Sequence, residues 1–131
     1  MTEAELIVYL KSKYLPDCEK ADDVFNTWDV RFTHRLVKYY GELKCRVDHY
    51  DSLLIEEDKY RRLLSLAAAN DRSAAYINST PEGIFGWNLN EVPEPVWERR
   101  LMPATTQFEN TEKVMKSVGY LPVAHGKRLD R

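Results

Sequence analysis

The chain has 131 residues, a net charge of −2, and hydrophobic and charged fractions of 44% and 31%. This length suits one domain over 1–131, and the composition excludes a largely disordered chain. No apolar run is long enough to span a membrane, so no membrane partner is expected. The small negative charge argues against a general nucleic-acid coat protein. Two cysteines, Cys18 and Cys45, give neither a disulfide framework nor repeated metal-ligand spacing, so a cytoplasmic location is expected.

Hydrophobic periodicity predicts helices and strands along the first ninety residues. Apolar residues three and four apart indicate helices, while alternating apolar and polar residues indicate half-buried strands. Thr2 and Glu5 form a capping-box pattern, and Gly41 marks a strand position where a side chain does not fit. The expected elements are, in chain order, a helix over 3–14, a loop or short edge strand over 17–27, strands over 28–32 and 36–47 joined by a turn over 33–35, a helix over 56–69, and strands over 74–78 and 84–89.

The last forty residues give a weaker pattern. Three prolines favour a loop over 91–104 with an edge strand at most. Asn110 or Thr111 is expected to cap a final short helix that stops at Gly119, and the polar, basic tail over 122–131 is expected to fray. The whole order predicts an α/β (α+β) fold, in which helices flank a mixed central β-sheet.

Two acidic residues and a lysine are expected to meet on neighbouring strands. Glu42 and Lys44 are two apart and share one strand face, and an antiparallel hairpin can bring Asp29 beside them. Two adjacent carboxylates repel each other, and a hard divalent metal such as Mg²⁺ relieves that repulsion. The backbone carbonyl of Leu43 is a further candidate ligand, and Lys44 can orient an attacking water or neutralise a phosphate.

The same spacing also has an ordinary structural interpretation. A Glu-x-Lys sequence is common, and an acidic residue beside a lysine across two strands usually forms a surface ion pair of little energy. A structural α/β domain whose acidic residues form only such pairs is therefore an open alternative. Metal titration distinguishes the two, because a structural domain binds neither Mg²⁺ nor DNA.

Three segments extend the pattern beyond this one motif, namely 28–32 (WDVRF), 40–46 (YGELKCR) and 54–63 (LIEEDKYRRL). Together they resemble the PD-(D/E)XK nuclease superfamily, which has a restriction-endonuclease-like core. That core contains a helix, a hairpin that bears Asp and then Glu-x-Lys, a second helix and further strands. The resemblance runs in element order through 1–90 and implies an Mg²⁺-dependent nuclease, with Mn²⁺ as substitute, that hydrolyses phosphodiester bonds of DNA.

The resemblance also implies roles for individual residues. Asp29 and Glu42 would be the metal ligands, and Lys44 would be the catalytic lysine. Many members add an acidic residue from the first helix, for which Glu5 is the best-placed candidate here. Some members carry a basic or polar residue at the start of the next helix, where this sequence has Lys59.

Further basic residues are candidates for contacts with nucleic acid. Arg46 follows Lys44 on the same strand face and can reach a phosphate, and Arg99 and Arg100 stand beside an aromatic residue that can stack on bases. The full set of DNA-binding candidates is Arg31, Arg46, Lys59, Arg99 and Arg100. The sequence does not distinguish DNA from RNA. So short a chain is expected to act as a homo-oligomer or to recognise DNA structure or ends.

The alternative within the same fold is a catalytically inactive protein that acts as a nucleic-acid-binding or assembly subunit. The presence of all three residues, Asp29, Glu42 and Lys44, argues against this alternative. An inactive subunit shifts DNA without cutting it, so a cleavage assay separates the two hypotheses.

Overall fold

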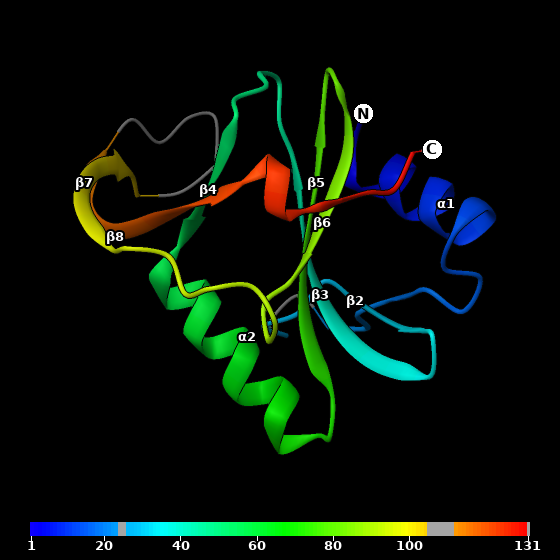
Figure 1. The fold of residues 1–131 in the computed structure, drawn as a ribbon. Coiled ribbons are helices and arrows are strands. Elements are labelled where there is room, and N and C mark those ends of the chain that lie inside the picture. Colours follow the sequence, from blue (N-terminus) through cyan, green and yellow to red (C-terminus); the bar gives the residue numbers. More distant parts are fainter. Residues whose placement is uncertain (24–25, 105–111, 131) are drawn as a thin grey trace.

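The computed structural model of the chain describes residues 1–23, 26–104 and 112–130. Within these ranges, helix α1 (Glu3–Lys13), a mixed six-stranded sheet, and a layer that contains helix α2 (Glu57–Ala69) and a three-stranded sheet lie on top of one another (Figure 1). The two helices cover opposite faces of the large sheet. No helix in this described part is both long and apolar enough to cross a membrane.

The large sheet contains the predicted hairpin. Strand β3 (Val37–Cys45) pairs antiparallel with β2 (Val30–His34) and parallel with β5 (Ser73–Thr80), so it lies inside the sheet. The hairpin turns at Arg35 and Leu36, which have positive φ angles of 50° and 69°. The strand order is β1-β2-β3-β5-β6-β9, with β1 at Glu19–Lys20, β6 at Gly83–Asn88 and β9 at Lys127–Arg128. The predicted antiparallel pairing is confirmed, with its turn slightly later than expected.

Helix α1 begins at the predicted capping box and packs on one face of the large sheet. Glu5 N donates to Thr2 Oγ1, and Thr2 N donates to Glu5 Oε1, both at 3.1 Å. The cluster between helix and sheet includes Leu6, Leu10, Val30, Phe32, Leu43 and Ile77. Gly41 lies against this cluster, where a Cβ would come within 3.0 Å of Val30 Cγ2, so the predicted lack of space is confirmed.

Helix α2 and the small sheet cover the other face. The chain passes from β3 through β4 (Ser52–Glu56) directly into α2 and then returns to β5, which is the crossover that a parallel pair requires. Strand β8 (Lys113–Pro122) pairs with β4 on one side and with β7 (Glu98–Pro103) on the other. Tyr76 Oη donates to Leu54 O at 3.0 Å and so ties the large sheet to β4.

The predicted final helix is wrong. Lys113–Pro122 forms strand β8, and the expected cap residues, Asn110 and Thr111, lie outside the described residues. Gly119, the predicted helix stop, lies inside this strand, where a Cβ would be only 2.5 Å from Pro95 Cβ. The glycine therefore gives room for the segment that crosses β8 and does not end a helix.

The expected frayed tail over 122–131 is also wrong for the residues up to 130. A 3-10 turn spans Val123–His125, and β9 then pairs with β6, where Arg128 lies opposite Phe85. Leu129 packs against the cluster on the α1 side of the sheet. These contacts return the end of the chain to the large sheet, close to the N-terminus (Figure 1).

Candidate functional site

Asp29 lies one residue before β2 and is held by both its backbone and its side chain. Its N–H donates to Gly41 O at 2.9 Å, which continues the β2–β3 pairing by one residue. Its carboxylate Oδ2 accepts from Leu43 N at 2.7 Å. The preceding Trp28 stacks on Tyr40 with 4.8 Å between ring centroids. The position of the Asp29 carboxylate is therefore determined by the hairpin itself.

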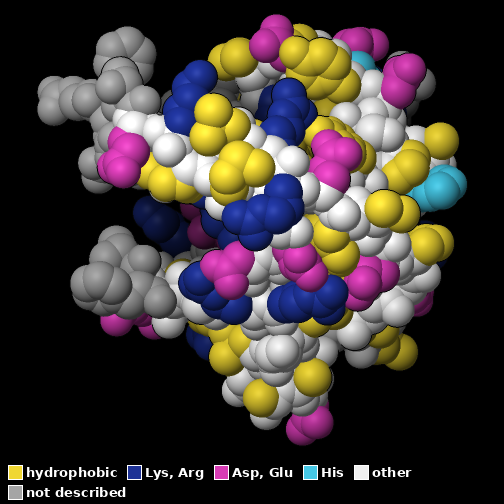
Figure 2. All heavy atoms as spheres, turned by 90° about the vertical axis from the view of Figure 1, so that its left-hand side faces the viewer, with side chains coloured by type: hydrophobic (Ala, Val, Ile, Leu, Met, Phe, Trp, Pro, Cys, Tyr) yellow, Lys and Arg dark blue, Asp and Glu magenta, His cyan; other side chains and the backbone are white. Residues whose placement is uncertain are grey.

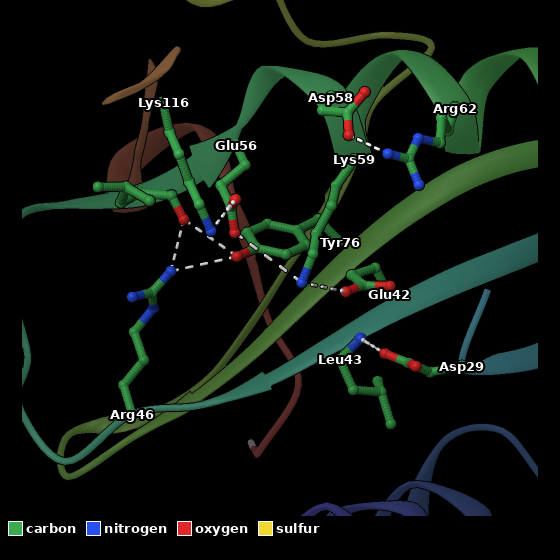
Figure 3. A network of polar contacts seen from close by, with 11 residues as sticks. Asp29, Glu42, Leu43, Arg46, Glu56, Asp58, Lys59, Arg62, Tyr76 and Lys116 are labelled. Atoms are coloured by element: carbon green, nitrogen blue, oxygen red, sulfur yellow. Dashed lines mark hydrogen bonds and ion pairs between the residues drawn. The ribbon is translucent and has the colours of Figure 1, made fainter. Parts of the chain in front are cut away.

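Glu42 projects from β3 on the side of α2, next to Asp29 (Figure 3). Only 16% of its side chain is exposed, and Lys59 Nζ lies 3.4 Å from its Oε1. Burial is the largest cause, and the charge of Asp29 the next, of a Glu42 pKa raised to about 7, which Lys59 partly lowers. Two carboxylates thus lie together in a site where holding both charges is costly.

Lys44 follows on the same face of β3 and is partly buried. Burial lowers the pKa of Lys44, and the nearby cations Lys59 and Arg46 lower it further, while Glu56 and Glu42 raise it. Among the described residues, Lys44 forms no hydrogen bond or ion pair. A half-buried ammonium without a direct partner, two residues from Glu42, has its donors available for an anionic ligand.

A chain of ion pairs leads from Glu42 to the small sheet (Figure 3). Lys59 lies between Glu42 and Glu56, with its Nζ 3.9 Å from Glu56 Oε2. Glu56 Oε1 in turn lies 3.0 Å from Lys116 Nζ. Lys116 was not among the predicted residues, because its segment was predicted to be a helix and is strand β8. Its strand and its partner can be identified only from the β4–β8 pairing.

Of the two acidic residues in the first turn of α1, Glu3 is the one whose pKa responds to Asp29. Glu5 is exposed, and its carboxylate accepts from Thr2 N in the capping box, so the structure does not bring it to Asp29. Glu3 is closer, since burial and then the charge of Asp29 raise the pKa of Glu3. The capping-box pattern was the signal in the sequence that already gave Glu5 another partner.

Arg46 points into the protein, although it was predicted to contact DNA. Its Nε donates to Asn78 Oδ1 at 2.5 Å, and its Nη2 donates to Leu54 O at 2.5 Å and to Tyr76 Oη at 3.1 Å. Asn78 is completely buried and Tyr76 nearly so. Arg46, which directly follows β3, therefore joins the end of that strand to β5 and β4.

The other predicted DNA contacts lie on exposed strands. Arg31 on β2 forms an ion pair with Glu19, with Nη2 2.6 Å from Oε2, and both side chains are about half exposed. Arg99 and Arg100 are exposed on β7, and Arg100 Nη1 donates to Tyr120 Oη at 2.6 Å. These residues remain accessible to a large ligand. The structure separates Arg31 on the large sheet from the pair on the small one.

The donor set fits a hard cation better than a borderline one. In the described part of the chain, no three His, Cys, Asp or Glu side chains are grouped to hold one metal ion. A site for Mg²⁺ needs only one or two carboxylates, with water and substrate phosphate as the other ligands. Asp29 and Glu42 meet this requirement, and a divalent cation would offset the repulsion that raises the Glu42 pKa. The Leu43 carbonyl is still only a prediction as a third oxygen ligand.

The fold is restriction-endonuclease-like, as the sequence resemblance implied. The chain is similar to the solved structure of Archaeoglobus fulgidus Hjc, a Holliday junction resolvase from an archaeal hyperthermophile. The TM-score is 0.63 at 16% sequence identity, over 97% of this chain and 88% of that chain. At this identity the likeness shows the fold alone. No protein-family model and no curated protein matches the chain.

Proposed function

We propose that the protein is a metal-dependent nuclease that hydrolyses phosphodiester bonds of DNA. The observation that carries this proposal is the pair of adjacent carboxylates, Asp29 and Glu42, with Lys44, which has no hydrogen bond or ion pair to any described residue, on the same strand as Glu42. The fold supports the same class of activity, because the similar solved structure is described as a Holliday junction resolvase. Branched DNA is therefore one of the substrates to test.

The roles of the residues follow from their chemistry. Asp29 and Glu42 would hold Mg²⁺, and Leu43 N, which donates to Asp29 Oδ2, would keep that carboxylate oriented. A bound ion would supply charge that attracts a phosphate oxygen and would make a nearby water more acidic. Lys44 donates to a phosphate oxygen and stabilises the charge that develops during hydrolysis. Glu42 must lose its proton to hold the ion, and its pKa is raised in the metal-free protein, so the Mg²⁺ concentration needed for cleavage is expected to fall as the pH rises.

A second candidate function is favoured by the ion pair of Lys59 with Glu42. Its ammonium lies 3.4 Å from the carboxylate and already neutralises part of the charge that a metal would neutralise. A protein in which this ion pair persists binds nucleic acid without cutting it. The Mg²⁺ dependence of cleavage decides between the two functions.

The test is a cleavage panel of plasmid, branched, duplex and single-stranded DNA, with RNA as a further arm, in Mg²⁺ and in EDTA. Glu42→Gln and Lys44→Ala are each expected to lower cleavage at least about 100-fold while the protein stays folded. Glu98→Gln, an exposed acidic residue on β7, serves as the matched control. Equal Mg²⁺-dependent cleavage by wild type and both site variants contradicts the proposal, and DNA binding without cleavage supports the second candidate.

A further inference from the structure

Two lysines from different elements converge on one carboxylate outside the acidic pair. Lys116 from β8 and Lys59 from α2 lie 3.0 Å and 3.9 Å from the two oxygens of Glu56 (Figure 3). Only 26% of the Glu56 and Lys116 side chains is exposed, so water screens this ion pair only in part. The arrangement is a cluster in which two lysines from different elements surround one acidic side chain.

Among the described residues, the Glu56 side chain forms ion pairs with these two lysines and no hydrogen bond that caps α2. It occupies the N-cap position of α2 but makes no side-chain capping hydrogen bond. Its two ion pairs are with Lys59 and Lys116, and its charge also acts on Lys44. The helix begins without this carboxylate, whose interactions are all with the lysines. A carboxylate and a phosphate oxygen are equivalent acceptors for an ammonium group.

The positive charge continues onto the neighbouring strand. Arg100 on β7 lies directly opposite Lys116 on β8. Like charges at directly opposed positions of a sheet repel each other, and an anion between the two side chains would reduce that repulsion. Tyr120, four residues after Lys116 on β8, accepts from Arg100 Nη1 and holds its side chain over this face. Lys59, Lys116 and Arg100 thus form a row that starts beside Glu42.

The wider surface around this row is mixed rather than uniformly basic. Figure 2, which looks onto the side of the molecule that carries β7 and β8, shows Lys and Arg side chains interspersed with Asp and Glu. Near the start of α2, for example, Arg61 pairs with Glu57, and Arg62 pairs with Asp58. Both of those pairs join residues four apart on α2, and the Arg62–Asp58 pair is well exposed, whereas the row crosses three elements.

We propose that Lys59, Lys116 and Arg100 bind successive phosphates of one DNA strand, and that Glu56 is an internal substitute for phosphate that releases Lys116 when the strand binds. This inference rests on the proposed nuclease function and extends it. The substrate becomes a polynucleotide that continues from the acidic pair across β8 toward β7. A mononucleotide cannot span the row, so a short substrate loses the affinity that the row supplies.

The test measures DNA affinity without cleavage. Binding of a fluorescein-labelled 20-base-pair duplex and of the matching single strand is followed by anisotropy in EDTA, across a range of salt concentrations. Lys116→Gln is expected to weaken binding about 5-fold or more and to lower the salt slope by about one. Glu56→Gln is expected to tighten binding several-fold, because the internal competitor loses its charge.

The matched control is Lys113→Gln. Lys113 lies three residues before Lys116 on β8, so its side chain points to the opposite face of the strand. Its loss is expected to change affinity less than twofold. Equal effects of Lys113→Gln and Lys116→Gln, or weaker binding by Glu56→Gln, overturn the proposal. If Lys116→Gln does not fold, Arg100→Gln and Lys116→Arg decide in its place, with loss expected for the first and retention for the second.

This experiment separates the row from the catalytic proposal. If the protein does not cleave DNA in Mg²⁺ but shows the expected changes in affinity with Lys116→Gln and Glu56→Gln, the DNA-binding row is supported and the nuclease function is contradicted. If cleavage depends on Glu42 as expected but Lys116→Gln binds DNA as well as the wild type, the nuclease function is supported and the DNA-binding row is contradicted.

Discussion

Replacing Glu42 by Gln is expected to stabilise the metal-free protein, and to do so more strongly as the pH rises. The folded protein holds the pKa of this carboxyl at about 7, above its ordinary value of 4.5, because the group is buried beside Asp29. Below pH 4.5 the carboxyl is neutral in both the folded and the unfolded chain. As the pH rises to about 7 and above, ionisation favours the unfolded chain, so wild-type stability falls. Glutamine does not ionise and avoids this loss.

The size of the effect follows from the two pKa values. One pKa unit corresponds to about 1.4 kcal/mol, so the loss grows from below about 1 kcal/mol at pH 5 to about 3 kcal/mol at pH 8.5. The Glu42 side chain is only 16% exposed, which keeps screening by water small. Lys59 can move closer to the ionised carboxylate, so the figure is an upper limit for the wild type.

Urea unfolding in EDTA at pH 5 and pH 8.5 measures the difference directly. We expect Glu42→Gln to exceed wild type in free energy of unfolding by about 2 to 3 kcal/mol more at pH 8.5 than at pH 5. The exposed variant Glu98→Gln is the control, with no such pH-dependent gain. A gain for Glu42→Gln that is the same at both pH values refutes the argument that burial beside Asp29 raises the pKa of Glu42.

Three further predictions concern the same region. Mg²⁺ is expected to raise the urea midpoint of the wild type more at pH 8.5 than at pH 6, since Glu42 must be ionised to bind it; an equal rise at both pH values contradicts this. Glu3→Gln is expected to weaken Mn²⁺ binding measured by calorimetry, while Glu5→Gln leaves it unchanged; the reverse order restores Glu5 as the helix ligand. Arg46→Met is expected to cost about 1 to 3 kcal/mol in urea unfolding, because buried Asn78 loses its partner, without changing the salt slope of DNA binding; a lower slope identifies a phosphate contact.

The acidic pair could be predicted from the sequence because it depends on local structure. Strands β2 and β3 are joined by a short turn, so their pairing follows from the alternation of apolar residues. Asp29 and Glu42 then become neighbours without any knowledge of the rest of the fold. The other elements up to β6 were also predictable from local patterns, except for β4, which pairs with the distant strand β8.

The remaining features depend on contacts between distant parts of the chain. A glycine after a short apolar run indicates a helix end by local rules, but Gly119 is needed because Pro95 crosses β8 there. The sequence around Lys116 contains no sign that it pairs with β4, so its approach to Glu56 was not predicted. Arg46 shares a strand face with Glu42, but its partners come from β4 and β5.

Direct binding of Mn²⁺ tests the central claim, a divalent cation held by Asp29 and Glu42, without depending on the choice of DNA. Free Mn²⁺ is measured by electron paramagnetic resonance at pH 8 as protein is added. The account predicts binding by the wild type at a single site and affinity at least about 10-fold lower for Asp29→Asn and for Glu42→Gln, with Glu98→Gln unchanged. Wild-type affinity in both site variants, or no binding by the wild type, contradicts the account.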